Sequence, residues 1–259
     1  MLGHDQVGSG PLRVIVMNDW IADTSTWDGA RAYLDERRFT WVFADLRGYG
    51  RSRGVRGDYT LAEAARDVVE LADALGFERF AIVGHSMSTL IALHLAQQLP
   101  ARIRRTVVLT PAPPASFNVD DATLAAMQSG AAADDATRIG LLRGIWGERL
   151  SERWTLFKAA RWRASSDVDA VVGYIRMYAR DGLPDRTTTI AGPVLAITGE
   201  QDSEVMRSAA VTELLSPLCE QLTVSSIAQC GHYPMQEAPP LLVTLVERFL
   251  VGDAPSSGR

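Results

Sequence analysis

The chain has 259 residues, of which 47% are hydrophobic and 22% are charged, values that are typical of a globular protein and exclude a disordered or fibrous one. This length fits one large α/β domain, with or without an insertion, or two small domains. The formal net charge is −5, and Lys and Arg form no basic stripe. Because basic side chains supply most of the affinity for phosphate groups, we expect no nucleic-acid partner.

Cysteine use and hydropathy bear on the compartment. The two cysteines, Cys219 and Cys230, form no CxxC pair, which argues against a structural zinc site and suits a reducing compartment. The first ten residues are polar where a secretory signal needs an apolar core, and no apolar run approaches the roughly 18 residues that span a bilayer. We therefore expect a cytoplasmic protein without a metal, a cofactor or a membrane partner, and we leave its oligomeric state open.

Short β-branched runs alternate with helical patterns, which is typical of a mostly parallel, doubly wound α/β sheet with helices on both faces. Six such runs predict strands, at residues 13–17, 41–45, 80–84, 105–110, 193–198 and 222–227. Three helices are predicted most clearly, at residues 61–75, 87–99 and 239–250. The first of them begins with Thr60 as the N-cap and Glu63 three residues later, which form a capping box.

The alternation is interrupted between residues 112 and 189, where the strand pattern is replaced by helical stretches. This interval is much longer than one crossover requires. We therefore expect an α/β core formed by residues 1–111 and 190–259, with a helical insertion at 112–189 above the sheet. The tail at 252–259 is expected to be disordered.

The first chemical motif lies where the third predicted strand runs into a helix, at Gly84-His85-Ser86-Met87-Ser88. A serine on such a strand-to-helix turn projects its hydroxyl above the edge of the sheet. Gly84 and Ser88 would be small because the turn brings backbone segments close together. Ser86 is thus a candidate nucleophile.

A serine nucleophile needs a base and an acid that orients the base. Asp202 follows the predicted strand at 193–198, and His232 follows the last predicted strand. Serine, acid and histidine in this order, beyond the carboxyl ends of parallel strands, indicate a catalytic triad. Glu200 and Glu204 are the alternatives to Asp202 as the acid.

Four segments together resemble an α/β-hydrolase-fold serine hydrolase, of the esterase- or lactonase-like kind with a helical cap. They are Asp45-Leu46-Arg47-Gly48-Tyr49-Gly50-Arg51-Ser52, the turn around Ser86, Gly199-Glu200-Gln201-Asp202, and Gly231-His232-Tyr233-Pro234 with Glu237 and Pro239. The resemblance implies a triad of Ser86, Asp202 and His232, and it places the helical insertion where the family carries its cap. Asp45 and Arg47 are expected to brace their loop.

The chain departs from the family in two places. The family's N-terminal β-hairpin is expected to be missing or vestigial, because only twelve residues precede the first predicted strand. In addition, Asn18-Asp19-Trp20 replaces the usual His-Gly segment after that strand. By position, the backbone N–H groups of Trp20 and Met87 would form the oxyanion hole. The Asp19 side chain is expected to turn away from this hole and to hydrogen-bond its own loop.

These features predict a hydrolase that cleaves a small-molecule ester or lactone with an apolar portion through an acyl-enzyme. The substrate pocket is expected to involve Asp19 and the tryptophans of the insertion, Trp146, Trp154 and Trp162. The alternative is a cofactor-free, non-hydrolytic use of the fold as a perhydrolase, C–C hydrolase, lyase or oxygenase. A ligand-binding protein without catalysis is a further alternative, since a fold does not determine a function.

Overall fold

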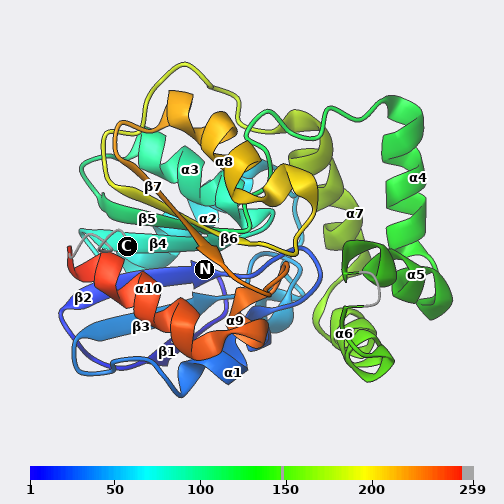
Figure 1. Ribbon diagram of the computed structural model, residues 1–259, viewed down its shortest axis with the longest axis horizontal. Coiled ribbons are helices and arrows are strands. Elements are labelled where there is room, and N and C mark those ends of the chain that lie inside the picture. The colour runs from blue at the N-terminus through cyan, green and yellow to red at the C-terminus, as the bar shows by residue number, and fades with distance from the viewer. Residues whose placement is uncertain (147–148, 253–259) are drawn as a thin grey trace.

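A seven-stranded sheet forms the centre of the computed structural model, which describes residues 1–146 and 149–252, without the side chain of Trp146 (Figure 1). The order across the sheet is β1-β3-β2-β4-β5-β6-β7. The strands are β1 (His4–Val7), β2 (Leu12–Met17), β3 (Phe39–Ala44), β4 (Phe80–His85), β5 (Ile103–Leu109), β6 (Val194–Gly199) and β7 (Leu222–Ile227). All neighbours pair in parallel except β1, which is antiparallel to β3, so the predicted fold class is confirmed.

All six predicted strands are present, and β1 is the one that the sequence prediction missed. It pairs with β3 from His4 opposite Ala44 to Val7 opposite Trp41, and it does not pair with β2. The N-terminal segment therefore adds one antiparallel edge strand instead of a hairpin. Its sequence, HDQV, contains a single apolar residue, so that no apolar alternation marks it as a strand.

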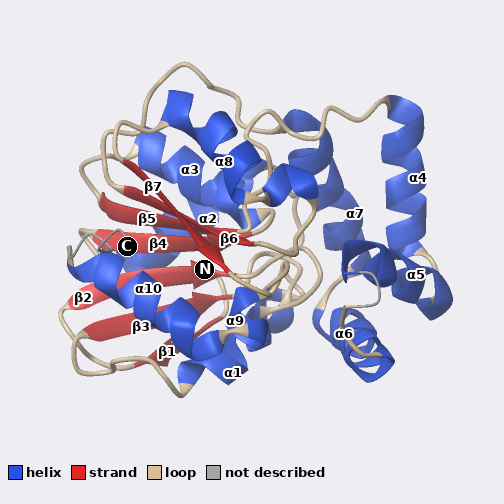
Figure 2. Cartoon of the chain, in the orientation of Figure 1, coloured by secondary structure: helices blue, strands red, loops and turns tan. Residues whose placement is uncertain are grey.

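The parallel strands are buried on both faces, as their near-continuous apolar sequences require. Every residue of β3, β4 and β6 is buried. Figure 2 shows α10 (Pro239–Val251) and the short α1 (Asp28–Arg31) on one face of the sheet, with α2 (Leu61–Ala74) and α3 (Ser88–Gln98) on the other. Helix α8 (Ser208–Leu215) connects β6 to β7, and α9 (Pro234–Glu237) precedes α10.

The three predicted helices are confirmed as α2, α3 and α10, with boundaries that differ by one or two residues. The capping box at the start of α2 also forms. The Thr60 side chain accepts a hydrogen bond from the Glu63 N–H at 3.2 Å. The Glu63 carboxylate accepts in turn from the N–H of Tyr59, one residue earlier than the usual partner.

Four α-helices lie between β5 and β6, at one end of the sheet (Figures 1 and 2). They are α4 (Asp121–Ala132), α5 (Asp135–Trp146), α6 (Glu152–Ser165) and α7 (Val168–Arg176), and a π-helical turn (Met177–Asp181) follows. We call residues 112–189 the helical insertion. Several hydrogen bonds attach it to the loops that follow β2 and β3, including those of Arg53 and Arg56. The Trp20 indole donates to the Val171 carbonyl, and the Asp167 N–H donates to the Gly48 carbonyl, both at 2.8 Å.

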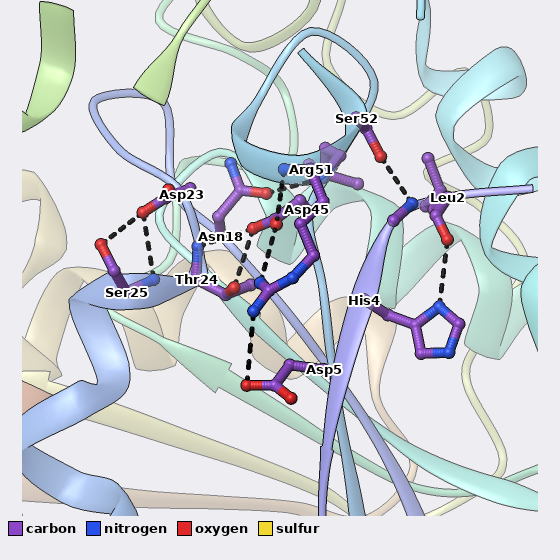
Figure 3. Close-up of polar contacts among 12 residues, drawn as sticks. Leu2, His4, Asp5, Asn18, Asp23, Thr24, Ser25, Asp45, Arg51 and Ser52 are labelled. Atoms are coloured by element: carbon purple, nitrogen blue, oxygen red, sulfur yellow. Dashed lines mark hydrogen bonds and ion pairs between the residues drawn. The ribbon is translucent and has the colours of Figure 1, made fainter. Parts of the chain in front are cut away.

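The loop after β3 is braced by the buried carboxylate of Asp45 (Figure 3). One of its oxygens accepts from the N–H and the hydroxyl of Thr24, at 2.9 and 2.8 Å, and the other accepts from the Arg51 N–H at 3.0 Å. Gly50 is required beside it, because a Cβ there would lie 2.4 Å from this carboxylate. Arg47 forms a two-pronged ion pair with Asp67. Asp45 and Arg47 therefore stabilise the loop, as the sequence predicted.

Three further observations complete the description of the fold. One-turn 3-10 helices occur at Thr24–Trp27, Gly50–Ser52, Glu204–Met206 and Ser216–Leu218. No helix in residues 1–146 and 149–252 combines the length and the apolar character that a membrane span needs. The tail expected to be disordered lies outside the described residues from position 253 onward.

Candidate active site

Ser86 lies on the sharp turn between the last residue of β4 and the first turn of α3, and its φ is +53°. A residue other than glycine in this left-handed region carries strain of about 1–3 kcal/mol, which the surrounding structure must offset. The turn is held by hydrogen bonds from the Ser86 N–H to the Leu109 carbonyl (3.0 Å) and from the Thr89 N–H to the Ser86 carbonyl (3.1 Å). The strained serine that the sequence predicted is therefore present.

The residues on either side of this turn are small for a steric reason. A Cβ on Gly84 would lie 2.6 Å from the Ser88 carbonyl oxygen and 2.8 Å from the Thr89 Cα. The Ser88 hydroxyl accepts from the His85 N–H at 2.9 Å and donates to the His85 carbonyl at 3.1 Å. Ser88 is thus both the small residue that the turn demands and a polar clamp on the end of β4.

Asp202 follows β6, His232 follows β7, and the fold brings their side chains into contact. The His232 Nδ1 lies 2.8 Å from the Asp202 Oδ2, and both residues are buried. A carboxylate can only accept, so Nδ1 carries the proton and Nε2 of the neutral ring is left as a base. The alternative acids Glu200 and Glu204 are exposed.

Several backbone contacts fix the His232 loop. The Glu237 carboxylate accepts from the N–H groups of Gly231 (2.8 Å) and Tyr233 (3.0 Å), on either side of the histidine. The His232 carbonyl accepts from the buried His85 Nε2 at 2.7 Å. His85 therefore holds the His232 loop in place, while the adjacent Ser86 faces the cavity described below.

The charge environment of the His–Asp pair favours its ionised form. Burial by itself lowers the pKa of His232, but the charge and hydrogen bond of Asp202 outweigh it, and the pKa is raised above its ordinary value of 6.5. Burial likewise raises the pKa of Asp202, yet His232 and the Ser203 N–H lower it overall. The carboxylate is therefore ionised at neutral pH and attracts a proton to the imidazole.

Ser86, Asp202 and His232 line one cavity of about 420 Å³. The rest of its wall is predominantly apolar. The core contributes Trp20, Ile21 and Met206, and the helical insertion contributes Ala112, Phe117, Val119, Met127, Leu141, Ile145 and Tyr178. A cavity of this size, with few polar groups gathered at one end, is typical of a site for a small molecule.

Two backbone N–H groups near Ser86 are free to donate. Within the described part of the chain, neither the N–H of Trp20 nor that of Met87 has a protein acceptor. The Trp20 side chain is held by its bond to Val171 and by edge-on packing against Trp162, with ring centroids 5.0 Å apart. The Trp20 carbonyl accepts from the Tyr49 hydroxyl at 2.7 Å. The loop that carries the Trp20 N–H is therefore rigid.

Asp19 is fully buried at the edge of the cavity. Its Oδ1 accepts from the Ala22 N–H at 3.1 Å, so the side chain bonds its own loop as expected. Its Oδ2 accepts from the Tyr233 hydroxyl at 2.7 Å, a contact that the sequence prediction missed. Burial raises the pKa of Asp19, but the charge of Lys158 and the hydrogen bond from Tyr233 are among the effects that lower it overall. Asp19 is therefore a buried carboxylate.

Two of the tryptophans predicted to line the pocket do not line this cavity. Trp162 is buried against Trp20, and Trp154 packs edge-on against Tyr233 with ring centroids 5.5 Å apart. They support lining residues from behind, because their helix turns them toward the core. The side chain of Trp146, at the end of α5, lies outside the described residues.

Comparison with known proteins identifies the family. The model of the alpha/beta hydrolase fold family matches residues 20–239, and the chain belongs to this family. The first curated relatives are uncharacterized Mycobacterium proteins, 38% identical over 104 residues, and the match covers 30% of their length.

Three further proteins are similar to this chain. A 2-heptyl-3-hydroxy-4(1H)-quinolone dioxygenase of Mycobacteroides abscessus is 32% identical over 43% of this chain and 44% of that protein. A pimeloyl-[acyl-carrier protein] methyl ester esterase of Nitrosomonas europaea is 23% identical over 93% of this chain and 96% of the esterase. The solved enol-lactonase of Burkholderia xenovorans superposes with a TM-score of 0.82 at 21% identity, covering 96% of both chains, and shows the shared fold.

The crowding at Gly84 leads to a stability prediction. Gly84→Ala should lower the free energy of unfolding by about 1–3 kcal/mol, because the added methyl must displace backbone of the next helix. Gly54→Ala is the control: a Cβ there meets no atom within 4 Å, so the change should stay within about 0.5 kcal/mol. Urea denaturation of both variants measures the difference, and equal midpoints would contradict the close contact.

Proposed function

We propose that this protein is a serine hydrolase that cleaves a small ester or lactone through an acyl-enzyme. The observation that carries the proposal is the 2.8 Å bond between Asp202 and His232 in the same cavity as a serine whose φ is +53°. A protein that only binds its ligand gains nothing from an oriented Ser/His/Asp set beside a strained serine. Similarity along nearly the whole chain to a methyl ester esterase also supports the proposal.

The chemistry follows from the roles that the contacts permit. The His232 Nε2 takes the proton of Ser86 as the hydroxyl attacks the substrate carbonyl, and Asp202 stabilises the imidazolium that forms. The N–H groups of Trp20 and Met87 stabilise the negative charge that develops on the carbonyl oxygen. The imidazolium then returns its proton to the leaving oxygen. In the second half, His232 activates a water that releases the acid and regenerates Ser86.

The cavity wall supports an uncharged, apolar acyl portion as the substrate. Aliphatic and aromatic side chains form most of the wall, and among the residues that the structure describes no Lys or Arg lines it. A carboxylate or phosphate placed there would lose its hydration without gaining an ionic partner. The helical insertion contributes a large part of this wall, so we infer that it acts as a cap that selects the acyl group by size.

Covalent labelling tests the proposal. A fluorophosphonate should modify Ser86, located by mass spectrometry of peptides, and Ser86→Ala should abolish both labelling and hydrolysis of 4-nitrophenyl butyrate. The variant should fold normally, because alanine leaves the hydrogen bonds of the turn in place. Turnover that persists in Ser86→Ala would refute the nucleophile. Turnover of an oxidisable or cleavable C–C substrate, with Ser86 unlabelled, would favour the non-hydrolytic alternative instead.

The His–Asp pair gives a pH prediction. His232 accepts a proton only when neutral, so activity should be lost as the pH falls through its pKa, which Asp202 raises above 6.5. The acid limb of kcat/KM should therefore have its midpoint above pH 6.5. In Asp202→Asn the rate should fall by about 10³–10⁴-fold, and the midpoint of the residual activity should move to lower pH, because the largest charge that raises the pKa of His232 is removed. Glu200→Gln is the control, with an unchanged profile. A collapse of activity in that variant would identify Glu200 as the acid.

The cavity wall gives a specificity prediction. Met127→Ala should enlarge the pocket and raise kcat/KM for octanoyl relative to butyryl esters by roughly tenfold, because each accommodated methylene contributes about 1–3 kcal/mol. Leu156→Ala is the control, since this exposed side chain on α6 does not line the cavity. Kinetics with a series of 4-nitrophenyl esters measures the preference. Identical preferences in both variants would exclude Met127 from acyl recognition.

A further inference from the structure

Lys158 is the only lysine in the chain, although Lys and Arg together number 26. It lies on α6 of the helical insertion and is 1% exposed. Its ammonium has no hydrogen-bond acceptor among the residues that the structure describes. Burying a charge without a hydrogen bond is costly, so a lysine at this position requires a compensating interaction.

The compensation comes from an aromatic face and a nearby anion. The Lys158 Nζ lies 3.9 Å from the centroid of the Tyr233 ring and 5.9 Å from that of Trp154. A desolvated ammonium over an aromatic face is attracted by the negative charge of the ring's π face. The hydroxyl of the same tyrosine donates to Asp19 at 2.7 Å. Tyr233 therefore contacts a buried cation on its face and a buried anion at its hydroxyl.

The contacts among Lys158, Tyr233 and Asp19 lie next to both the proposed oxyanion hole and the proposed catalytic histidine. Asp19 immediately precedes Trp20, whose N–H is free, and Tyr233 immediately follows His232. A lone carboxylate beside this loop would oppose the negative charge that develops on a substrate carbonyl oxygen. It would also attract a proton to the catalytic imidazole. Asp19 is nevertheless needed as an acceptor, because it bonds both Ala22 and Tyr233.

The two histidines that also act on Asp19 are His85 and His232, and His232 is positive only when it is protonated. The His85 Nδ1 is 4.0 Å from the Asp19 Oδ2, but the proton of His85 lies on Nε2, which donates to the His232 carbonyl. Burial lowers the pKa of His85 to about 4, so the ring is neutral and presents a lone pair to the carboxylate. Arg161, on the same helix as Lys158, is paired with Asp23 at 3.6 Å. Lys158 is the remaining cation.

We propose that Lys158 is a positioning residue of the active site, whose buried ammonium acts through Tyr233 to offset the Asp19 carboxylate beside Trp20 and His232. The helical insertion would thus place a positive charge near the reacting groups in addition to lining the pocket. The rate effect rests on the proposed hydrolase function. The electrostatic coupling itself does not rest on it, and the two are measured separately below.

The first measurement reads Lys158 directly and needs no substrate. Because the chain holds one lysine, selective ¹³C labelling gives a single ε-carbon signal by NMR. Burial lowers the pKa of Lys158, while Asp19 and Asp23 oppose this effect and Arg161 adds to it, and the result is about 8. We expect a titration near pH 8 that moves lower in Asp19→Asn, where one anion is removed. A Lys158 titration near pH 10.5 that is unchanged in Asp19→Asn would overturn the proposal.

The second measurement follows His232 in Lys158→Met, which keeps the aliphatic stem and should fold, since replacing a buried charge by an apolar side chain is often tolerated. The charges facing His232 are those of Asp202, Asp19 and Lys158, together with the His85 ring. Without the lysine, the NMR pKa of His232 should rise by several tenths of a unit. Asp19→Asn/Lys158→Met should bring it back toward the wild-type value.

Kinetics with 4-nitrophenyl butyrate tests the rate effect. Lys158→Met should lower kcat about tenfold with KM changed less than twofold, and Asp19→Asn/Lys158→Met should recover most of the loss.

Wild-type activity should also decline above pH 8 as Lys158 deprotonates, and this alkaline limb of the pH profile should be absent in Lys158→Met. Arg153→Met removes an exposed cation of the same helix and is the control, which should leave kcat and the midpoints of both pH limbs unchanged. A Lys158→Met variant with wild-type kcat and pH limbs would overturn the proposal. Failure of the hydrolase function itself would appear instead as an unlabelled Ser86 in the wild type.

Discussion

The left-handed conformation of Ser86 is the constraint on which the site depends. Strand β4 ends at His85 and α3 begins at Ser88, and the positive φ of Ser86 turns the chain from strand to helix within these two intervening residues. The strain is offset by hydrogen bonds on both sides of the turn and by the absence of a side chain at Gly84. The rigid sheet behind the turn makes this possible, because the Ser86 N–H bonds to the end of the neighbouring strand β5. The serine hydroxyl is consequently presented to the cavity before any ligand arrives.

Around that serine, loops that are far apart in the chain are held by buried polar contacts. Glu237 bonds the backbone on both sides of His232, His85 bonds its carbonyl, and Asp45 braces the loop after β3. Asp45 and His85 are buried, and a hydrogen bond in a buried site is stronger than the same bond would be in water. The precision of the His232–Asp202 pair therefore comes from a surrounding shell of hydrogen bonds.

The buried charges near the site form two pairs that differ in how their members contact each other. Asp202 and His232 contact each other directly, whereas Asp19 and Lys158 act through the ring and hydroxyl of Tyr233. An indirect arrangement leaves the carboxylate free to accept from the Ala22 N–H and so to shape the loop around Trp20. It also links the helical insertion to the sheet by electrostatics, beside the hydrogen bond between Trp20 and Val171.

The sequence by itself determined what depends on local pattern. The six parallel strands, the capped helix at Leu61–Ala74 and the order of Ser86, Asp202 and His232 could be predicted, because apolar periodicity, capping residues and strand-to-helix turns are properties of neighbouring residues. Strand β1 could not, because an edge strand with one apolar residue exists only through its pairing with β3. The tertiary structure alone decided that Trp154 and Trp162 face the core. It also decided that Asp19, Lys158 and Tyr233 meet, since helix rotation and long-range contacts set both outcomes. The one signal in the sequence for that meeting was a single lysine among 26 basic residues, and only its burial gives that lysine a physical meaning.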